Sequence, residues 1–180
     1  MDLVIKPLDE SSVDAAVALD DSFLVDSELI LHAERGVIHF EVTMVSPSYW
    51  KSYADQGQSD FERAPDREVY LAWLGDQVVG RLILSEGWNR FAWVEDLVVD
   101  RASRRLGIAR ALLDRALQWA SARHLPGLRL ETQHNNVGAC QLYQSYGFRL
   151  EGFDRNLYRG IDGAKAEIAL YWYYLTEVND

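Results

Sequence analysis

Residues 98–113 (VVDRASRRLGIARALL) hold the side chains best suited to chemistry in this chain. An apolar, β-branched strand is expected to end at Asp100, a basic loop follows, and a helix is expected to begin near Leu106. The first N–H groups of a helix have no partner within it, and the helix dipole favours negative charge there. This order of elements predicts an anion site, which we interpret as a pyrophosphate cradle.

Gly107 and three arginines carry that interpretation. Gly107 has no side chain, so the backbone can approach a bulky ligand closely. Arg104, Arg105 and Arg110 add positive charge to a chain that is acidic elsewhere. The same residues would also suit a surface loop with solvated arginines, and the loop alone does not separate the two interpretations.

The spacing of the loop distinguishes it from two common phosphate loops. The nucleoside-triphosphate loop needs G-x-x-x-x-G-K-[ST] and the dinucleotide fingerprint needs G-x-G-x-x-G, and the chain contains neither. It contains Arg104-x-x-Gly107-x-Ala109 after a Val-Val strand end. This pattern resembles the acyl-CoA site of the GNAT superfamily of N-acyltransferases.

A second motif lies further along the chain, in the order that the same superfamily shows. Residues 136–148 follow the pattern N-x-x-A-x-x-L-Y-x-x-x-G-F. The resemblance covers roughly residues 69–175 and implies a single-domain GNAT fold over residues 1–180, of the α+β class, with a mixed, mostly antiparallel central sheet flanked by helices. It also implies that Asn136 contacts coenzyme A and that Tyr143 reaches the thioester sulfur.

Tyr143 suits the role of general acid on chemical grounds. A phenol with a pKa of about 10 can protonate a departing thiolate whose pKa is about 8.5. The alternative is that Tyr143 only packs in the core, as aromatic residues on helices commonly do. For Asn136 the alternative is an N-cap, which is compatible with ligand binding.

Glu95 and Asp96 stand in the middle of an apolar strand. Alternation predicts that their side chains point to opposite faces, and a carboxylate there is costly unless it is paired or solvated. The resemblance implies that this strand bulges and that Glu95 is the general base, while backbone groups of Leu97 and Val99 pair with the pantetheine arm. The alternative for Glu95 is a salt bridge to an arginine on an adjacent element.

The C-terminal half resembles one group within the superfamily, the streptothricin acetyltransferases. The resemblance is carried by residues 129–143, 152–154, 169–173, 76–80 and 88–89. It implies acetyl-CoA as co-substrate, an amino group in the β-lysine portion of a streptothricin antibiotic as acceptor, and resistance as the outcome. The expected acceptor-binding residues are Trp88, Glu95, Asp96, Asp154 and Tyr171. The expected coenzyme-binding residues are Leu97, Val98, Val99, Arg104, Arg105, Leu106, Gly107, Ile108, Ala109, Arg110, Asn136 and Tyr143.

The charge of the chain supports a cationic acceptor. Its 180 residues include 18 basic and 28 acidic side chains, so the formal net charge is −10. Nucleic acid is excluded as the main partner because phosphate binding needs a basic face. Acidic side chains would steer a polycation, although many acidic proteins are merely soluble.

The remaining sequence features favour direct transfer. Cys140 is the only cysteine, and it lies in a helical pattern without a neighbouring base, so we expect a buried, inert thiol. The four histidines lack metal-ligand spacing, so no metal is expected.

We see no signal peptide and no apolar run of about 18 residues, so no membrane partner is expected and a cytoplasmic location is the default. The family resemblance leaves a homodimer open. Two other functions stay open: a GNAT enzyme acting on a polyamine, an aminoglycoside or a protein N-terminus, and a non-catalytic coenzyme A sensor.

The periodicity of the chain also predicts its elements. Strands are expected at residues 3–7, 37–45, 68–74, 77–85, 91–99, 128–132, 148–153 and 166–175. Helices are expected from Ser11 or Ser12 to residue 23, over 27–35 with a stop at Gly36, from Ser46-Pro47 onward, over 106–124 and over 135–146. Residues 55–66 are expected to form a loop.

Overall fold

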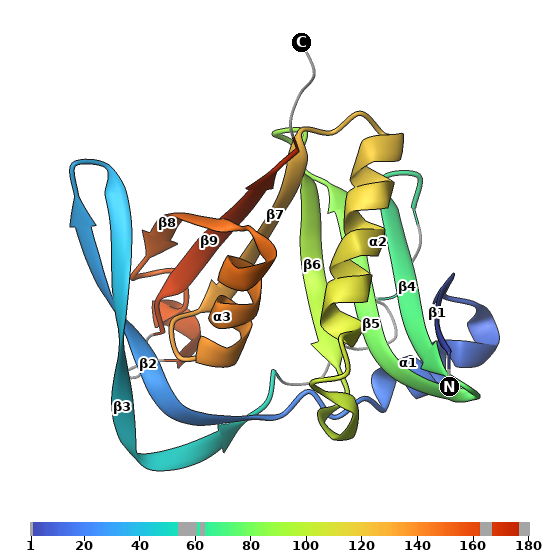
Figure 1. Cartoon of the computed structure of the whole chain (residues 1–180), viewed down its shortest axis with the longest axis horizontal. Coiled ribbons are helices and arrows are strands. Elements are labelled where there is room, and N and C mark those ends of the chain that lie inside the picture. The colour runs from blue at the N-terminus through green and yellow to red at the C-terminus, as the bar shows by residue number, and fades with distance from the viewer. Residues whose placement is uncertain (1, 54–60, 62–63, 163–166, 177–180) are drawn as a thin grey trace. The chain divides into compact units, whose positions relative to one another are not determined.

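The computed structural model describes residues 2–53, 61, 64–162 and 167–176. The described chain divides into two compact units. The first unit takes its residues from 2–22, 52–128 and 176, and the second from 23–51 and 129–175. Each unit has its own strands and helices (Figure 1).

Antiparallel strands form the sheet of the first unit, in the order β1-β4-β5-β6. Their bounds are β1 Leu3–Pro7, β4 Arg67–Leu74, β5 Gln77–Glu86 and β6 Ala92–Val99. Gly75 and Asp76 connect β4 to β5, and Gly75 has a φ of 64°, as a tight hairpin turn requires. The predictions of these strands and of the hairpin at Gly75-Asp76 are confirmed.

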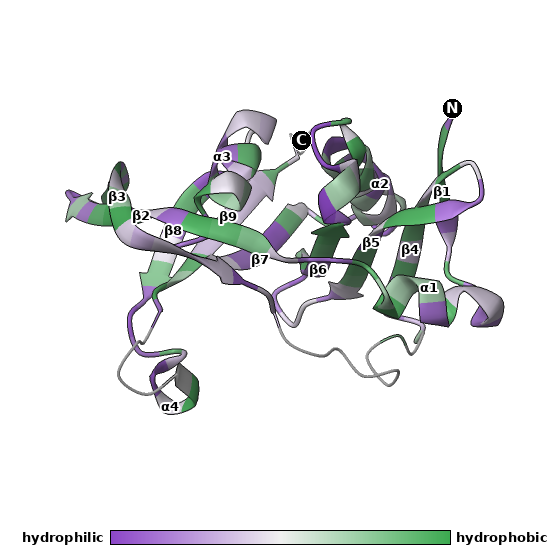
Figure 2. Ribbon diagram, turned by 90° about the horizontal axis from the view of Figure 1, so that it is seen from below, coloured by the Kyte–Doolittle hydropathy of each residue, from purple (hydrophilic) through white to green (hydrophobic). Residues whose placement is uncertain are grey.

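Both faces of β4 and β5 are buried, which explains their continuous apolar sequences. On one face, Val69, Leu71 and Ile83 form a core cluster that includes Ala16 of α1 (Val13–Val17) and Phe61. The other face is covered by α2 (Ile108–Ala122), whose buried residues include Leu112, Leu113 and Ala116. Figure 2 shows β4, β5 and β6 in the colour of hydrophobic residues.

Gly80 lets α2 lie directly on β5. A Cβ atom at this position would stand 3.0 Å from the carbonyl oxygen of Val98 and 3.2 Å from side-chain atoms of Ile108 and Leu112. Only a residue without a side chain therefore permits this approach without displacing a neighbour. The close packing holds the first turn of α2 near the end of β6, where the predicted anion site lies.

The second unit contains a long hairpin, three further strands and an α-helix packed among aromatic residues. Its elements are β2 Phe23–Glu34, β3 Val37–Lys51, all but the first two residues of β7 (Gly127–Gln133), α3 Val137–Tyr146, β8 Arg149–Asp154, α4 Arg159–Asp162 and β9 Ala169–Leu175. β9 lies between β7 and β8. The ring of Tyr143 on α3 packs against Phe148 and Trp172, with centroid distances of 5.7 and 6.2 Å.

Two predicted helices are wrong, because residues 27–34 belong to β2, residue 35 to the turn that follows, and residues 47–51 to β3. Arg35 and Gly36 have φ values of 52° and 79°, and two consecutive residues with positive φ favour a tight hairpin. The turn therefore joins two strands. Gly36 is part of a hairpin turn and does not end a helix, contrary to the prediction. Pro47 falls where the β2–β3 pairing shifts register, so its missing N–H breaks no ladder bond.

The predicted helix from Ser11 or Ser12 to residue 23 is much shorter in the structure. A 3₁₀ turn (Glu10–Ser12) leads into α1, which ends at Val17. The predictions for α2, β7, α3, β8 and β9 are confirmed to within a few residues, and Gly147 closes α3 with a φ of 119°. Most of the predicted loop at 55–66 lies outside the described residues. In the described part of the chain, no helix is long and apolar enough to cross a membrane.

Candidate active site

The predicted anion cradle of the first unit has a defined loop between β6 and α2. The Asp100 carboxylate accepts a hydrogen bond from the backbone N–H of Ala102 at 3.0 Å and thereby caps the 3₁₀ turn Arg101–Ser103. Arg105 and Gly107 then adopt φ values of 67° and 81°. The left-handed conformation at Gly107 turns the chain into α2, whose N-cap it forms.

The N-terminus of α2 has the features of an anion site. A Cβ atom at Gly107 would have no neighbour within 4 Å among the described residues, so the approach to the first turn is open. The N–H of Ala111 donates to the Gly107 carbonyl at 3.1 Å, which begins the internal ladder of the helix. The N–H groups in the first turn of an α-helix have no acceptor within the helix, and here that turn begins at Ile108. Leu106 is 63% exposed, and Arg105 and Arg110 are exposed as well.

Arg104 lies within the loop and stabilises it. Its guanidinium donates to the carbonyl oxygens of Val99 at 3.1 Å and of Ser22 at 2.7 Å. Burial lowers the pKa of Arg104, while Asp20, Asp21 and Asp100 nearby act in the opposite direction. The position of Arg104 therefore fixes the shape of the cradle as well as adding charge to it.

A β-bulge interrupts β6 at Glu95. Ile83 pairs with Asp96 and Leu84 pairs with Val94, so Glu95 has no opposite residue on β5. Sequence alternation predicted that Glu95 and Asp96 point to opposite faces, and this prediction is wrong. The bulge turns both carboxylates toward arginines that share one face of the sheet.

Both carboxylates have arginine partners in the first unit. Arg67 Nε donates to Glu95 at 2.9 Å, and the Glu95 side chain remains 32% exposed. The salt bridge considered as the alternative for Glu95 is therefore present. Arg81 Nε donates to Asp96 at 2.7 Å, where the two side chains are only 7% and 13% exposed. Of the two carboxylates, Glu95 is the one accessible to a substrate.

Asp96→Asn is expected to destabilise the fold by about 3 kcal/mol, because it leaves the buried Arg81 guanidinium without its counter-ion. Arg81 also donates to the Ala16 carbonyl at 2.6 Å, so it cannot move into water without breaking that contact. Urea unfolding of the variant measures the loss. The double variant Arg81→Met/Asp96→Leu should recover much of it, and an unfolding midpoint of Asp96→Asn equal to that of the wild type would contradict the expectation.

In the second unit, Asn136, predicted to contact coenzyme A, is the N-cap of α3, and Tyr143, predicted to reach the thioester sulfur, lies on that helix. The Asn136 side chain caps the helix by accepting from the N–H of Ala139 at 3.2 Å, as the alternative for this residue predicted. Tyr143 is 6% exposed, and its ring packs in the aromatic core described above. The geometry thus gives both residues a structural role.

Cys140 on α3 is buried, 1% exposed, and burial raises its pKa to about 12. At pH 8 only about one thiol in 10⁴ would be ionised, so Cys140 is no nucleophile. We expect iodoacetamide at pH 8 to leave the folded protein unmodified and to alkylate Cys140 in denaturant, as measured by intact mass. Rapid alkylation of the folded protein would show that the thiol is accessible.

The residues predicted to bind the acceptor are distributed over both units. Trp88 is 91% exposed in the turn between β5 and β6 of the first unit. Asp154 and Tyr171 are half-buried in the second unit. Burial raises the pKa of Tyr171, and the negative charges of Glu131 and Asp154 act in the same direction. Asp154 and Tyr171 therefore share one electrostatic environment.

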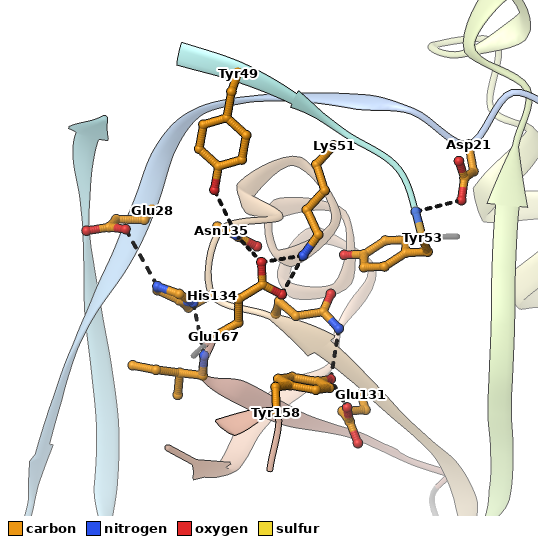
Figure 3. Close-up of polar contacts among 12 residues, drawn as sticks. Asp21, Glu28, Tyr49, Lys51, Tyr53, Glu131, His134, Asn135, Tyr158 and Glu167 are labelled. Atoms are coloured by element: carbon orange, nitrogen blue, oxygen red, sulfur yellow. Dashed lines mark hydrogen bonds and ion pairs between the residues drawn. The ribbon is translucent and has the colours of Figure 1, made fainter. Parts of the chain in front are cut away.

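A polar network in the second unit was not predicted from the sequence. Lys51 forms an ion pair with Glu167, and Asn135 donates to the same carboxylate at 2.8 Å (Figure 3). Gln133 donates to the hydroxyl oxygen of Tyr158 at 2.8 Å, and that hydroxyl group donates to Glu131. The signal that could have indicated the network is the spacing of Glu131, Gln133 and Asn135 at alternate positions.

His134 connects this network to the β2–β3 hairpin. Its Nδ1 accepts from the N–H of Ile168 at 3.2 Å, so the ring proton resides on Nε2, 3.6 Å from Glu28. Burial lowers the pKa of His134, which keeps the imidazole neutral at physiological pH. Among the described side chains, no group of three His, Cys, Asp or Glu residues could hold a metal ion.

Comparisons with known proteins identify the family. A family model described as the acetyltransferase (GNAT) family matches residues 40–148. A streptothricin acetyltransferase of Escherichia coli is 35% identical over 161 residues, which cover 89% of this chain and 90% of that protein.

Two solved structures show the same fold. A candidate streptothricin acetyltransferase from Bacillus anthracis str. Ames, in complex with acetyl coenzyme A, has a TM-score of 0.91 and 37% identity, covering 97% of this chain and 100% of that one. Nourseothricin acetyltransferase has a TM-score of 0.82 and 30% identity, covering 96% and 98%. The mixed, mostly antiparallel sheet flanked by helices is thus the GNAT fold, as predicted, and the chain belongs to the GNAT family as an N-acetyltransferase with acetyl-CoA as its co-substrate.

Proposed function

We propose that the chain acetylates an amino group in the β-lysine portion of a streptothricin-type antibiotic and so confers resistance. The observation that carries this proposal is the similarity to a streptothricin acetyltransferase over 89% of the chain. The net charge of −10 supports it independently, because acidic proteins attract polycations at long range.

The cradle at the start of α2 fits the pyrophosphate of acetyl-CoA. Gly107 leaves open space over the first turn, and Arg105 and Arg110 are exposed beside it. The N–H groups of residues 107–110 would bind phosphate oxygens, with Arg104 fixing the loop from within. Backbone groups at 97–99 would extend the site along β6. In the second unit, Asn136 is proposed to contact coenzyme A, as the family resemblance implies.

Glu95 is the proposed general base. Its carboxylate is accessible beside the bulge of β6, and an amine must lose its proton before it can attack a carbonyl. Arg67 holds the carboxylate at 2.9 Å, so proton transfer through an intervening water is the expected route. Asp96, held by Arg81 in the interior, would support the strand instead of acting on substrate.

Direct transfer in a ternary complex follows from these assignments. The amine nitrogen forms a bond to the acetyl carbonyl carbon, a backbone N–H at 97–99 stabilises the charge on the carbonyl oxygen, and the carbon–sulfur bond breaks. Tyr143 donates its phenolic proton to the departing thiolate. The products are an amide, the free thiol and one proton, and the buried Cys140 thiol takes no part in the transfer.

A thiol-release assay with acetyl-CoA, with and without streptothricin, tests the proposed function. Thiol release that requires the antibiotic is the expected result. Spermidine, an aminoglycoside and a peptide with a free N-terminus are the comparison acceptors. Release with one of these and not with streptothricin would overturn the proposed substrate. Coenzyme binding without release for any amine would overturn the proposed activity.

A further inference from the structure

Four oxygen-bearing side chains converge in the polar network of the second unit. They are Glu131, Gln133, Asn135 and Glu167, and we call them the acceptor cluster. Glu131 and Gln133 share a face of β7 because alternate residues of a strand point the same way, and Asn135 follows in the next turn. Neither the coenzyme cradle nor the proposed base uses any of these residues.

The orientation of Asn135 is set by its neighbour Glu167. The Asn135 side-chain amide lies 2.8 Å from a Glu167 carboxylate oxygen and 3.3 Å from the Tyr49 hydroxyl oxygen. An ionised carboxylate only accepts hydrogen bonds, so the NH₂ group of Asn135 must face it. The amide oxygen therefore points elsewhere. Asn135 is 4% exposed, and in the described structure that oxygen is buried without a donor.

The orientation of Gln133 follows from the same reasoning. The Tyr158 hydroxyl group donates to Glu131, which can only accept, so the Tyr158 oxygen must accept from Gln133. The NH₂ group of Gln133 is thus used at 2.8 Å, and its amide oxygen is left over. This oxygen is also buried, and no described group donates to it.

The acceptor cluster consequently offers two vacant amide oxygens beside two carboxylates. Buried polar atoms in native proteins almost always have a partner, so two vacant acceptors in one network indicate a donor that binds there. A primary ammonium supplies three donors, no acceptor, and the positive charge that the carboxylates favour. The ion pair between Lys51 and Glu167 shows an ammonium already bound to one of these carboxylates (Figure 3).

We propose that the acceptor cluster binds an ammonium group of the acceptor substrate through the amide oxygens of Gln133 and Asn135. The inference rests on the proposed function, since a β-lysine moiety carries primary amines on a short alkyl chain. The cluster therefore determines which amines are accepted, while the cradle of the first unit determines the coenzyme.

Steady-state kinetics of three variants test this subsite. Gln133→Met keeps the volume of the side chain and removes both the amide oxygen and the NH₂ group that donates to Tyr158. Gln133→Glu also removes the NH₂ group but keeps an acceptor oxygen, so the difference between the two variants reports on the oxygen. We expect Gln133→Met to raise KM for streptothricin about tenfold, the effect of one hydrogen bond to a charged group, without changing KM for acetyl-CoA. Gln133→Glu should retain a KM close to that of the wild type. The matched control is Gln144→Met, an exposed glutamine on α3, which should change neither constant.

The outcomes separate this inference from the proposed function. If the wild type acetylates streptothricin and Gln133→Met has the same KM, the subsite is wrong and the proposed function stands. Equal increases of KM for both substrates would also overturn it, because they indicate general distortion.

If the wild type does not acetylate streptothricin, the proposed function fails and the subsite is tested by binding. L-lysinamide is then titrated calorimetrically into the acetyl-CoA-saturated wild type and Gln133→Met. Tighter binding to the wild type supports the subsite. Equal binding, or no binding to the wild type, overturns it.

Discussion

Replacing Tyr143 by Phe is expected to lower kcat by about 10²-fold or more, with little change in KM for acetyl-CoA. The substitution removes only the hydroxyl group that would protonate the departing thiolate. The ring itself should keep its place, because its packing against Phe148 and Trp172 does not involve the oxygen. Turnover is measured by thiol release with streptothricin, and binding is measured by titration of acetyl-CoA.

Tyr146 is the matched control for this prediction. It lies on the same helix, and its ring packs against Phe148 and Tyr174 at centroid distances of 5.9 and 5.7 Å. Tyr146→Phe should turn over at the wild-type rate with an unchanged fold. If Tyr143→Phe also turns over at the wild-type rate, Tyr143 only packs in the core and another group must be the general acid.

The second large effect is expected for Glu95→Gln, which should lower kcat about 10²-fold at neutral pH. The difference in kcat between the wild type and the variant should become smaller as the pH approaches the pKa of the amine, about 10.4 for a lysine-type group. At that pH the amine loses its proton to the solvent without a general base. The change in unfolding free energy should stay below about 1 kcal/mol, since the ion pair with Arg67 is partly exposed to solvent and contributes little.

Glu86→Gln provides the comparison. Glu86 pairs with Arg90 at 3.3 Å, and its side chain is 31% exposed, close to the 32% of Glu95. The Glu86→Gln variant should have the turnover and the pH profile of the wild type. A Glu95→Gln enzyme with the wild-type pH profile would show that the carboxylate only forms a salt bridge.

The fold of residues 67–154 could be predicted from the sequence because local signals there agree with one another. Gly75 and Gly147 adopt the positive φ values that their turns require, and the apolar runs between them match the buried strands and helices. Residues 23–51 were harder, because most of the hairpin is exposed and its burial pattern gives no clean alternation. The feature that determines the hairpin is the turn at Arg35-Gly36, where both residues have positive φ. In the sequence, Gly36 is the only sign of this turn.

The part of the candidate site that one continuous segment forms was predictable from the sequence, whereas the parts that combine side chains from several elements were not. Gly107 and the arginines near it follow one another in the chain, so their spacing suggests the cradle, and the second motif at 136–148 favours it over a solvated loop. The bulge at Glu95 reverses the face of its neighbour, which no alternation rule can anticipate. The acceptor cluster combines β7 with Glu167, and its alternate polar residues look like an ordinary solvated strand face.

Localisation of the acetyl group on the product tests the central claim most directly. Streptothricin is incubated with the enzyme and acetyl-CoA, and the product is examined by mass spectrometry and NMR. The account predicts one added acetyl group, as an amide on an amino group of the β-lysine portion, formed in equal amount to the free thiol. An unmodified antibiotic, or an acetyl group on another part of the molecule, would contradict it.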